Sequence, residues 1–248
     1  TSESTQLADG STQQTTTVGT QKVITTHSVQ EDGSLKAVTK TEGGTTLKEE
    51  ITSFDEAGAP TVTAKEYLGE NHTRVTVSDA ETKTVVTTEA GAVTKAVKDI
   101  AADKTVTTSV SADNEVVVTE QIGHHAAPVT TATGTLSVAA GTGVETLALT
   151  TVNAAGAVTG SEVITVKSDG TEEKTTKDTS GNTLSAVETS EGNDGTVRVS
   201  TTQNGVETET FIFLSGESVT FTTNTSDGSV VFTEQVLSGG RLVEQQLG

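Results

Sequence analysis

The chain contains no cysteine, so it has no disulfide, no thiolate ligand for a metal and no thiol nucleophile. Methionine and tryptophan are also absent, and Tyr67 is the only tyrosine. Proline occurs only at Pro60 and Pro128, whereas disordered segments are usually rich in proline. No apolar run reaches about 18 residues, the length that a membrane-spanning helix needs. These absences exclude cysteine chemistry and lead us to expect no membrane insertion.

Positive charge is scarce, because 15 Lys and Arg stand against 34 Asp and Glu and give a formal net charge of −19. Nucleic-acid binding needs a basic surface, and anionic lipid also repels an acidic protein. We therefore expect no nucleic-acid partner. Hydrophobic residues make up 31% of the chain and are mostly Val and Ala, so any core is expected to be thin.

Val and Thr are abundant, and both favour β-strands because their Cβ atoms are branched. Many runs alternate between apolar and polar positions; Val75 and Val77, for example, alternate with Arg74, Thr76 and Ser78. Turn signals that contain Gly, Asn or Asp separate these runs. The pattern predicts an all-β chain built from antiparallel meanders.

The sequence contains an internal duplication, in which the pattern of residues 124–248 resembles that of residues 1–123. The clearest match pairs residues 111–122 with residues 225–236. Residues 92–102 are the only segment with helical spacing. Their counterpart in the second copy alternates like a strand, so we predict a strand there as well.

The duplication predicts two tandem homologous antiparallel β domains. We favour a β-sandwich for each domain, with a single-layer meander or a β-solenoid as the alternatives. The expected organisation is an extended N-terminal segment with an inter-subunit strand, a first copy, a joint that includes a strand, and a second copy. These parts cover residues 1–21, 22–122, 123–144 and 145–248.

Candidate binding and modification sites are few. Acidic turns supply oxygen ligands that suit Ca²⁺, and Asp113, Asp194 and Asp227 are the candidates. None of them lies in a recognised calcium loop, so hairpin turns are the interpretation that we favour. Asn71 and Asn224 each begin a formal N-glycosylation sequon.

No catalytic constellation stands out in the sequence. It has no G-x-S-x-G elbow and no strong phosphate-binding or dinucleotide fingerprint. The carboxylate pairs Glu49-Glu50 and Glu172-Glu173 recur in both copies, which is unusual for an active site. We interpret them as strand-edge charges that prevent unwanted sheet pairing. We expect no enzymatic activity and no cofactor.

A chain that repeats turns, strands and charge, without visible chemistry, indicates a structural role. We expect a secreted subunit of an extracellular or cell-surface filament, such as a fibre of a biofilm matrix. Residues 1–21 would add a strand to the next subunit, so that self-assembly proceeds head to tail. The alternative is a repeat module of an adhesin or a phage fibre that binds a host or carbohydrate ligand. The absence of Met from the sequence suggests a mature chain without its leader, or a fragment of a longer polypeptide.

Overall fold

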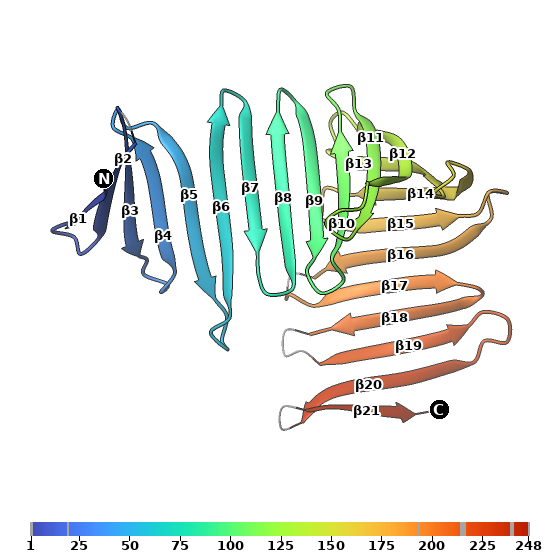
Figure 1. Ribbon diagram of the computed structural model, residues 1–248. Coiled ribbons are helices and arrows are strands. Elements are labelled where there is room, and N and C mark those ends of the chain that lie inside the picture. Colours follow the sequence, from blue (N-terminus) through green and yellow to red (C-terminus); the bar gives the residue numbers. More distant parts are fainter. Residues whose placement is uncertain (1, 19, 193, 214–216, 239–240, 248) are drawn as a thin grey trace. The chain divides into compact units, whose positions relative to one another are not determined.

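The computed structural model describes residues 2–18, 20–192, 194–213, 217–238 and 241–247. Residues 1 and 19 of the predicted N-terminal segment, and residues 193, 214–216, 239–240 and 248 of the predicted second copy, lie outside this set. The described residues form 21 β-strands of one open antiparallel sheet and no helix (Figure 1). The all-β prediction is therefore confirmed.

Contacts divide the chain into two compact units, one of Thr1–Asp113 with Val117–Val129 and one of Asn114–Val116 with Thr130–Gly248. The strands before the division are β1 (Ser2–Gln6), β2 (Thr12–Val18), β3 (Gln21–Val29), β4 (Leu35–Thr41), β5 (Thr46–Phe54), β6 (Pro60–Gly69), β7 (His72–Ser78), β8 (Thr82–Glu89), β9 (Ala92–Asp99) and β10 (Lys104–Val110). Strand β11 (Glu115–Ile122) has residues in both units. The later strands are β12 (Val129–Val138), β13 (Glu145–Val152), β14 (Val158–Val166), β15 (Glu172–Lys177), β16 (Thr183–Glu191), β17 (Val197–Gln203), β18 (Val206–Ile212), β19 (Ser218–Asn224), β20 (Val230–Ser238) and β21 (Arg241–Leu247).

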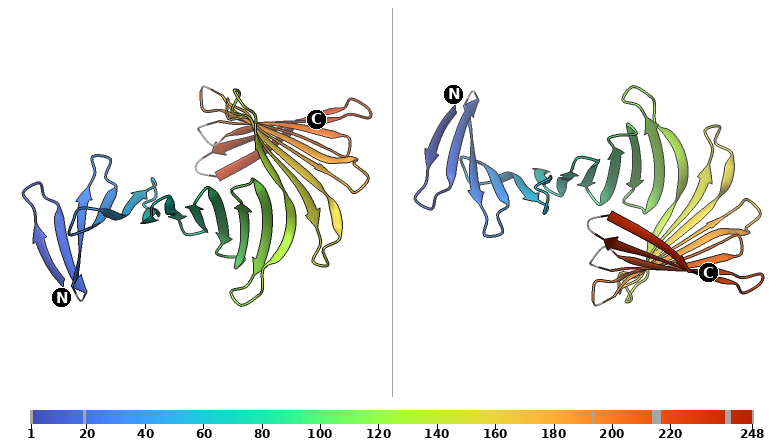
Figure 2. Two further views of the ribbon diagram at one scale, coloured as in Figure 1. Left: turned by 90° about the horizontal axis from the view of Figure 1, so that it is seen from above. Right: turned by 90° about the horizontal axis from the view of Figure 1, so that it is seen from below.

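Within each unit the strands form a meander. Antiparallel registers join neighbours in the sequence, from β1–β2 to β9–β10 in the first unit and from β12–β13 to β20–β21 in the second. Among the described residues, extensive contacts between strands likewise join only sequence neighbours, and Figure 2 shows the strands of each unit following one another in chain order. This pairing matches the single-layer meander that the sequence left open. The favoured sandwich is not confirmed.

The core is as thin as the composition predicts. Among the described residues, only Val116, Ala132 and Leu149 are buried hydrophobic side chains. Val and Thr side chains cover both faces of the meander, and they are too short to enclose one another without a second layer. Backbone pairing between neighbouring strands therefore makes a larger share of the stability than in a sandwich.

Leu149 is the largest of these three side chains, and it is 8% exposed. Replacing it with alanine is expected to lower the free energy of unfolding by about 2 kcal/mol, near the low end for a buried leucine. Leu184→Ala is the matched control, since Leu184 is 46% exposed and its loss should cost less than about 0.5 kcal/mol. Denaturant unfolding measures both variants, and equal losses would contradict this account of the core.

Two predicted segments fold as follows. Residues 92–102, which have helical spacing, contain strand β9, so the strand prediction is confirmed there. The predicted N-terminal segment holds β1 and β2, which pair with each other, and β2 also pairs with β3. The predicted joint at residues 123–144 contains β12, which pairs with β13.

Candidate functional site

Many turns of the meander share one hydrogen-bond pattern. The N–H of the first residue donates to the carbonyl of the residue four positions later, and the N–H of a glycine three positions later donates back. Each of these glycines has a positive φ, as a three-residue hairpin loop with a glycine bulge requires. The fully described turns of this kind span residues 7–11, 30–34, 41–45, 55–59, 153–157, 167–171 and 178–182, and Gly192, Gly195 and Thr196 make the same two hydrogen bonds.

A side-chain oxygen caps each of these turns. In the turn at residues 30–34, the Oδ1 of Asp32 accepts hydrogen bonds from the backbone N–H and the hydroxyl of Ser34, at 2.9 and 2.7 Å. Asp9 caps Ser11 in the same way. In other turns the first residue provides the cap; Asp55, for example, accepts from an N–H four positions later. Such caps satisfy backbone donors that the ladder cannot reach.

The caps shift the titration of the aspartates. The hydroxyl of Ser34, together with its backbone N–H, lowers the pKa of Asp32 from its ordinary value of 3.8. Ser11 lowers the pKa of Asp9 by the same two bonds. Hydrogen bonds also lower the pKa values of Asp79, Asp103, Asp169, Asp178, Asp194 and Asp227. The hydrogen bonds in these turns therefore stabilise the charged form of the carboxylates.

The three calcium candidates lie in separate turns. Asp113 follows β10, Asp194 precedes β17 and Asp227 precedes β20. Asp194 and Asp227 each use Oδ1 to accept the N–H of the residue two positions later, at 3.0 and 2.9 Å. Within the described residues, no three His, Asp or Glu side chains gather closely enough to hold a metal ion. Asp194 and Asp227 thus stabilise turns, and Asp113 lies in the turn between β10 and β11.

The two sequon asparagines occupy different environments. Asn71 is exposed in the turn between β6 and β7, where its φ is 56°. Asn224 ends β19 and is half-buried, and its Oδ1 accepts hydrogen bonds from the N–H and hydroxyl of Ser226. Asn71 is therefore the more accessible of the two to a modifying enzyme.

The recurring carboxylate pairs are not at a sheet edge, which corrects the sequence interpretation. Glu49 and Glu50 lie in β5, which is paired on both sides with β4 and β6. Glu172 and Glu173 lie in β15, between β14 and β16. Cations on nearby positions balance two of them: Lys48 is 2.6 Å from Glu50, and Lys167 pairs with Glu173. The pairs therefore do not guard an edge.

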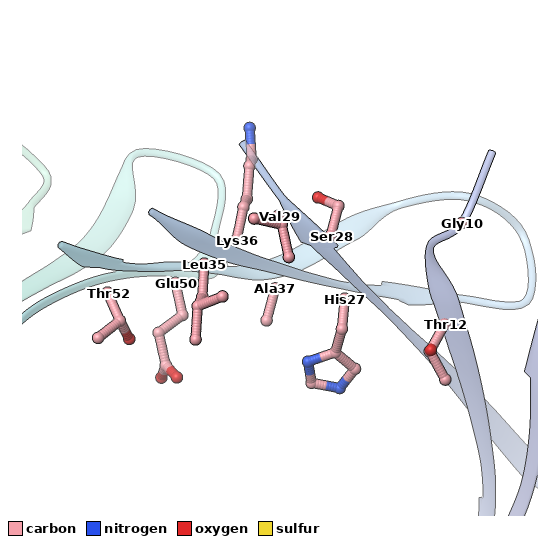
Figure 3. Close-up of a pocket in the computed structure, with 10 residues that line it drawn as sticks. All are labelled: Gly10, Thr12, His27, Ser28, Val29, Leu35, Lys36, Ala37, Glu50 and Thr52. Carbon is pink, nitrogen blue, oxygen red and sulfur yellow. The ribbon is translucent and has the colours of Figure 1, made fainter. Parts of the chain in front are cut away.

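A shallow groove of about 310 Å³ is lined by residues of β3, β4 and β5, together with Thr12 at the start of β2 and Gly10 in the turn before it (Figure 3). His27, Ala37 and Glu50 form a row across these strands, and the small Ala37 leaves a hollow between the imidazole and the carboxylate. Leu35 and Thr52 form the adjacent row on the same face. Thr12 of β2 lies opposite His27 and brings a hydroxyl to the same row. Among the described residues no hydrogen bond joins this hydroxyl, the imidazole and the carboxylate to one another, so the groove holds these groups without an assembled catalytic arrangement.

The outer edge of β1 is the most distinctive exposed feature of the first unit. Strand β1 pairs with β2 and with no other strand among the described residues, and it lies at the end of the meander in Figure 1. The N–H of Leu7 donates to the carbonyl of Ser11, so the backbone groups of Leu7 face β2. Because backbone groups alternate along a strand, those of Glu3 and Thr5 also face β2.

The backbone groups of Ser2, Ser4 and Gln6 consequently face away from the sheet. Natural edge strands usually carry a lysine, a proline, a bulge or a cover that prevents further pairing. Strand β1 contains none of the first three: its sequence is Ser-Glu-Ser-Thr-Gln, its register with β2 has no shift, and all five residues are exposed. Glu3 is the only charged residue of this strand.

No family model matches the chain, and no curated protein matches its sequence. In the part of the chain that the structure describes, no helix has the length and apolar composition of a membrane span.

Sequence reasoning missed both the caps and the groove. The caps had a readable signal, because Asp-Gly followed by Ser or Thr occurs at Asp9, Asp32, Asp169, Asp194 and Asp227. The row of His27, Ala37 and Glu50 had none, since it depends on the registers of three strands.

Proposed function

We propose that the chain is a non-enzymatic structural subunit of an extracellular or cell-surface filament, in which subunits join by adding strands at the β1 edge. The two tandem copies would serve as the building block, and a second copy of the chain would be the partner. An edge held together by backbone hydrogen bonds needs no specific side chain, which agrees with a sequence that lacks visible chemistry.

One observation carries the proposal: β1 presents its outward backbone groups with no lysine, no proline and no bulge, and with Glu3 as its only charge. A second observation supports it. With only three buried hydrophobic residues described, the fold has little core, and a subunit of this kind gains stability from surface buried in an assembly. A chain without cysteine and methionine suits an extracellular location, because it lacks the two residues that are most readily oxidised there.

Ser4→Pro is the sharpest test, because it removes an N–H that faces outward and leaves the bonds to β2 in place. We expect the unaltered chain to form oligomers or filaments in analytical ultracentrifugation and electron microscopy, and Ser4→Pro to reduce assembly by at least about tenfold. Ser4→Ala keeps the N–H and is the matched control, expected to assemble normally. Deleting residues 1–21 is a poorer test, since it would expose β3 as a new edge.

A chain that stays monomeric at high concentration, or a Ser4→Pro variant that assembles like Ser4→Ala, would sink this proposal. The alternative role, a repeat module of an adhesin or a phage fibre, would then be favoured. Its candidate binding surface is the groove between His27 and Glu50, where an imidazole and a carboxylate flank a hollow next to Leu35.

A further inference from the structure

The outward backbone groups of β1 are spaced evenly about the middle of the strand. They belong to Ser2, Ser4 and Gln6, so Ser4 stands at the centre with one outward residue on each side. An antiparallel partner with the same spacing would match all three residues at once. The same strand of a second copy has that spacing.

We infer that two copies of the chain join through an antiparallel β1–β1 pair centred on Ser4, related by a two-fold axis. The inference rests on the proposed function, because it names the partner strand of the same edge. It replaces the head-to-tail joint, expected from the sequence, with a symmetric one. Such a joint uses the β1 edge of both copies and stops at two chains, so a filament built from these pairs needs a second interface elsewhere on the chain. An interface in which one patch meets itself is the commonest way for two identical chains to pair.

The number of hydrogen bonds selects this register. Ser4 would face the partner's Ser4, and Ser2 would face the partner's Gln6 in both directions. Each such pair exchanges two backbone bonds, so the joint holds about six. Moving the partner by two residues in either direction leaves only two of the pairs and about four bonds.

Charge selects the same register. In the Ser4-centred pair, Glu3 lies opposite the partner's Thr5, a neutral residue. The register shifted toward the N-terminus places Glu3 directly opposite the partner's Glu3, and like charges in that position are destabilising. The other shifted register avoids this clash but loses hydrogen bonds. Only the Ser4-centred pair satisfies both conditions.

The joint is expected to be weak and to strengthen with salt. Five exposed residues on each side make an interface well below the size of stable complexes. Each copy also carries a net charge of −19, so the two copies repel one another at low ionic strength. Assembly should therefore be measured at high protein concentration and at about 0.5 M salt, where the Debye length is only a few ångströms.

A single cysteine tests the register directly, since the chain contains none of its own. Ser4→Cys would place two thiols opposite each other with Cα atoms about 5.5 Å apart, within the range of a disulfide. Glu3→Cys is the control, because its thiols would lie diagonally at about 7–8 Å, too far for an unstrained bond. Both variants should keep the circular dichroism of the unaltered chain.

Under mild oxidation we expect Ser4→Cys to form at least about tenfold more covalent dimer than Glu3→Cys. Equal yields, or no dimer from Ser4→Cys, would overturn the symmetric joint. If assembly nevertheless occurs and Ser4→Pro blocks it, the edge works with a different strand, and the proposed function stands without this inference. If Ser4→Cys cross-links but no assembly larger than a dimer forms, the inference stands and the filament does not.

Discussion

Replacing Gly134 with alanine is expected to separate β12 from β13 and to lower the free energy of unfolding by about 3 kcal/mol, the upper range for an overpacked site. Gly134 lies opposite Leu149, and the two strands approach closely at this point. A Cβ on residue 134 would stand 1.8 Å from the carbonyl oxygen of Ala148 and 2.9 Å from the Cα of Leu149. Both atoms belong to backbone, so no side chain can turn away to make room.

The matched control is Gly43→Ala. A Cβ on Gly43 would meet only the Oγ1 of Thr41, at 3.8 Å, which is an ordinary contact. We expect its stability to change by less than about 0.5 kcal/mol. Thermal and denaturant unfolding followed by far-ultraviolet circular dichroism compares the two. A Gly134→Ala variant as stable as Gly43→Ala would show that the close approach of β12 and β13 is absent from the folded protein.

The sequence predicts the strands of this fold well, because their signal is local. Alternation at Val75 and Val77 marks β7, and the Asp-Gly and Asn-Gly pairs mark turns in which a glycine adopts a positive φ. The duplication helped where the local signal was ambiguous: the alternating counterpart of residues 92–102 indicated a strand at β9.

Layering could not be predicted in the same way, because it depends on contacts between distant strands. Alternating Val and Thr suit a sandwich and a single layer equally, since in both architectures successive side chains of a strand point to opposite faces of the sheet. The position of Glu49-Glu50 shows the same limit. Their charges suggest an edge, but the number of strands on either side of β5 decides whether an edge exists. The close approach at Gly134 likewise depends on one register.

The unprotected edge lies between these two cases. Serine, threonine and glutamine in residues 2–6 indicate an exposed strand, and the sequence alone suggested that the segment serves a second subunit. Which backbone groups face outward follows only from the bond between Leu7 and Ser11 in the folded turn. Once this bond shows that Ser2, Ser4 and Gln6 face outward, the number of hydrogen bonds and the charge of Glu3 select the register centred on Ser4.

Acid should unfold this protein through its turns. Eight aspartates, all of them in turns between consecutive strands, have a pKa below the ordinary value of 3.8 in the folded chain because they accept hydrogen bonds. A folded-state pKa below the unfolded one stabilises the fold above the unfolded value, and this contribution is lost as pH falls through the folded value. We therefore expect stability to hold from pH 7 to about pH 5 and to fall steeply below about pH 4.

The double variant Asp32→Asn with Asp169→Asn separates this effect from net charge. Asparagine keeps the capping oxygen but cannot titrate, so the variant should be less stable at pH 7 and lose less on acidification. Glu56→Gln also removes a charge from a turn, but no described hydrogen bond joins the Glu56 side chain to a backbone group. The pH dependence of its stability should therefore match that of the unaltered chain. Relief of repulsion near the pI of about 4.4 acts in the opposite direction, and it acts on all three proteins. A steeper loss in the unaltered chain and in Glu56→Gln than in the double variant therefore identifies the caps as the acid-sensitive element, whereas parallel curves would assign acid unfolding to other groups.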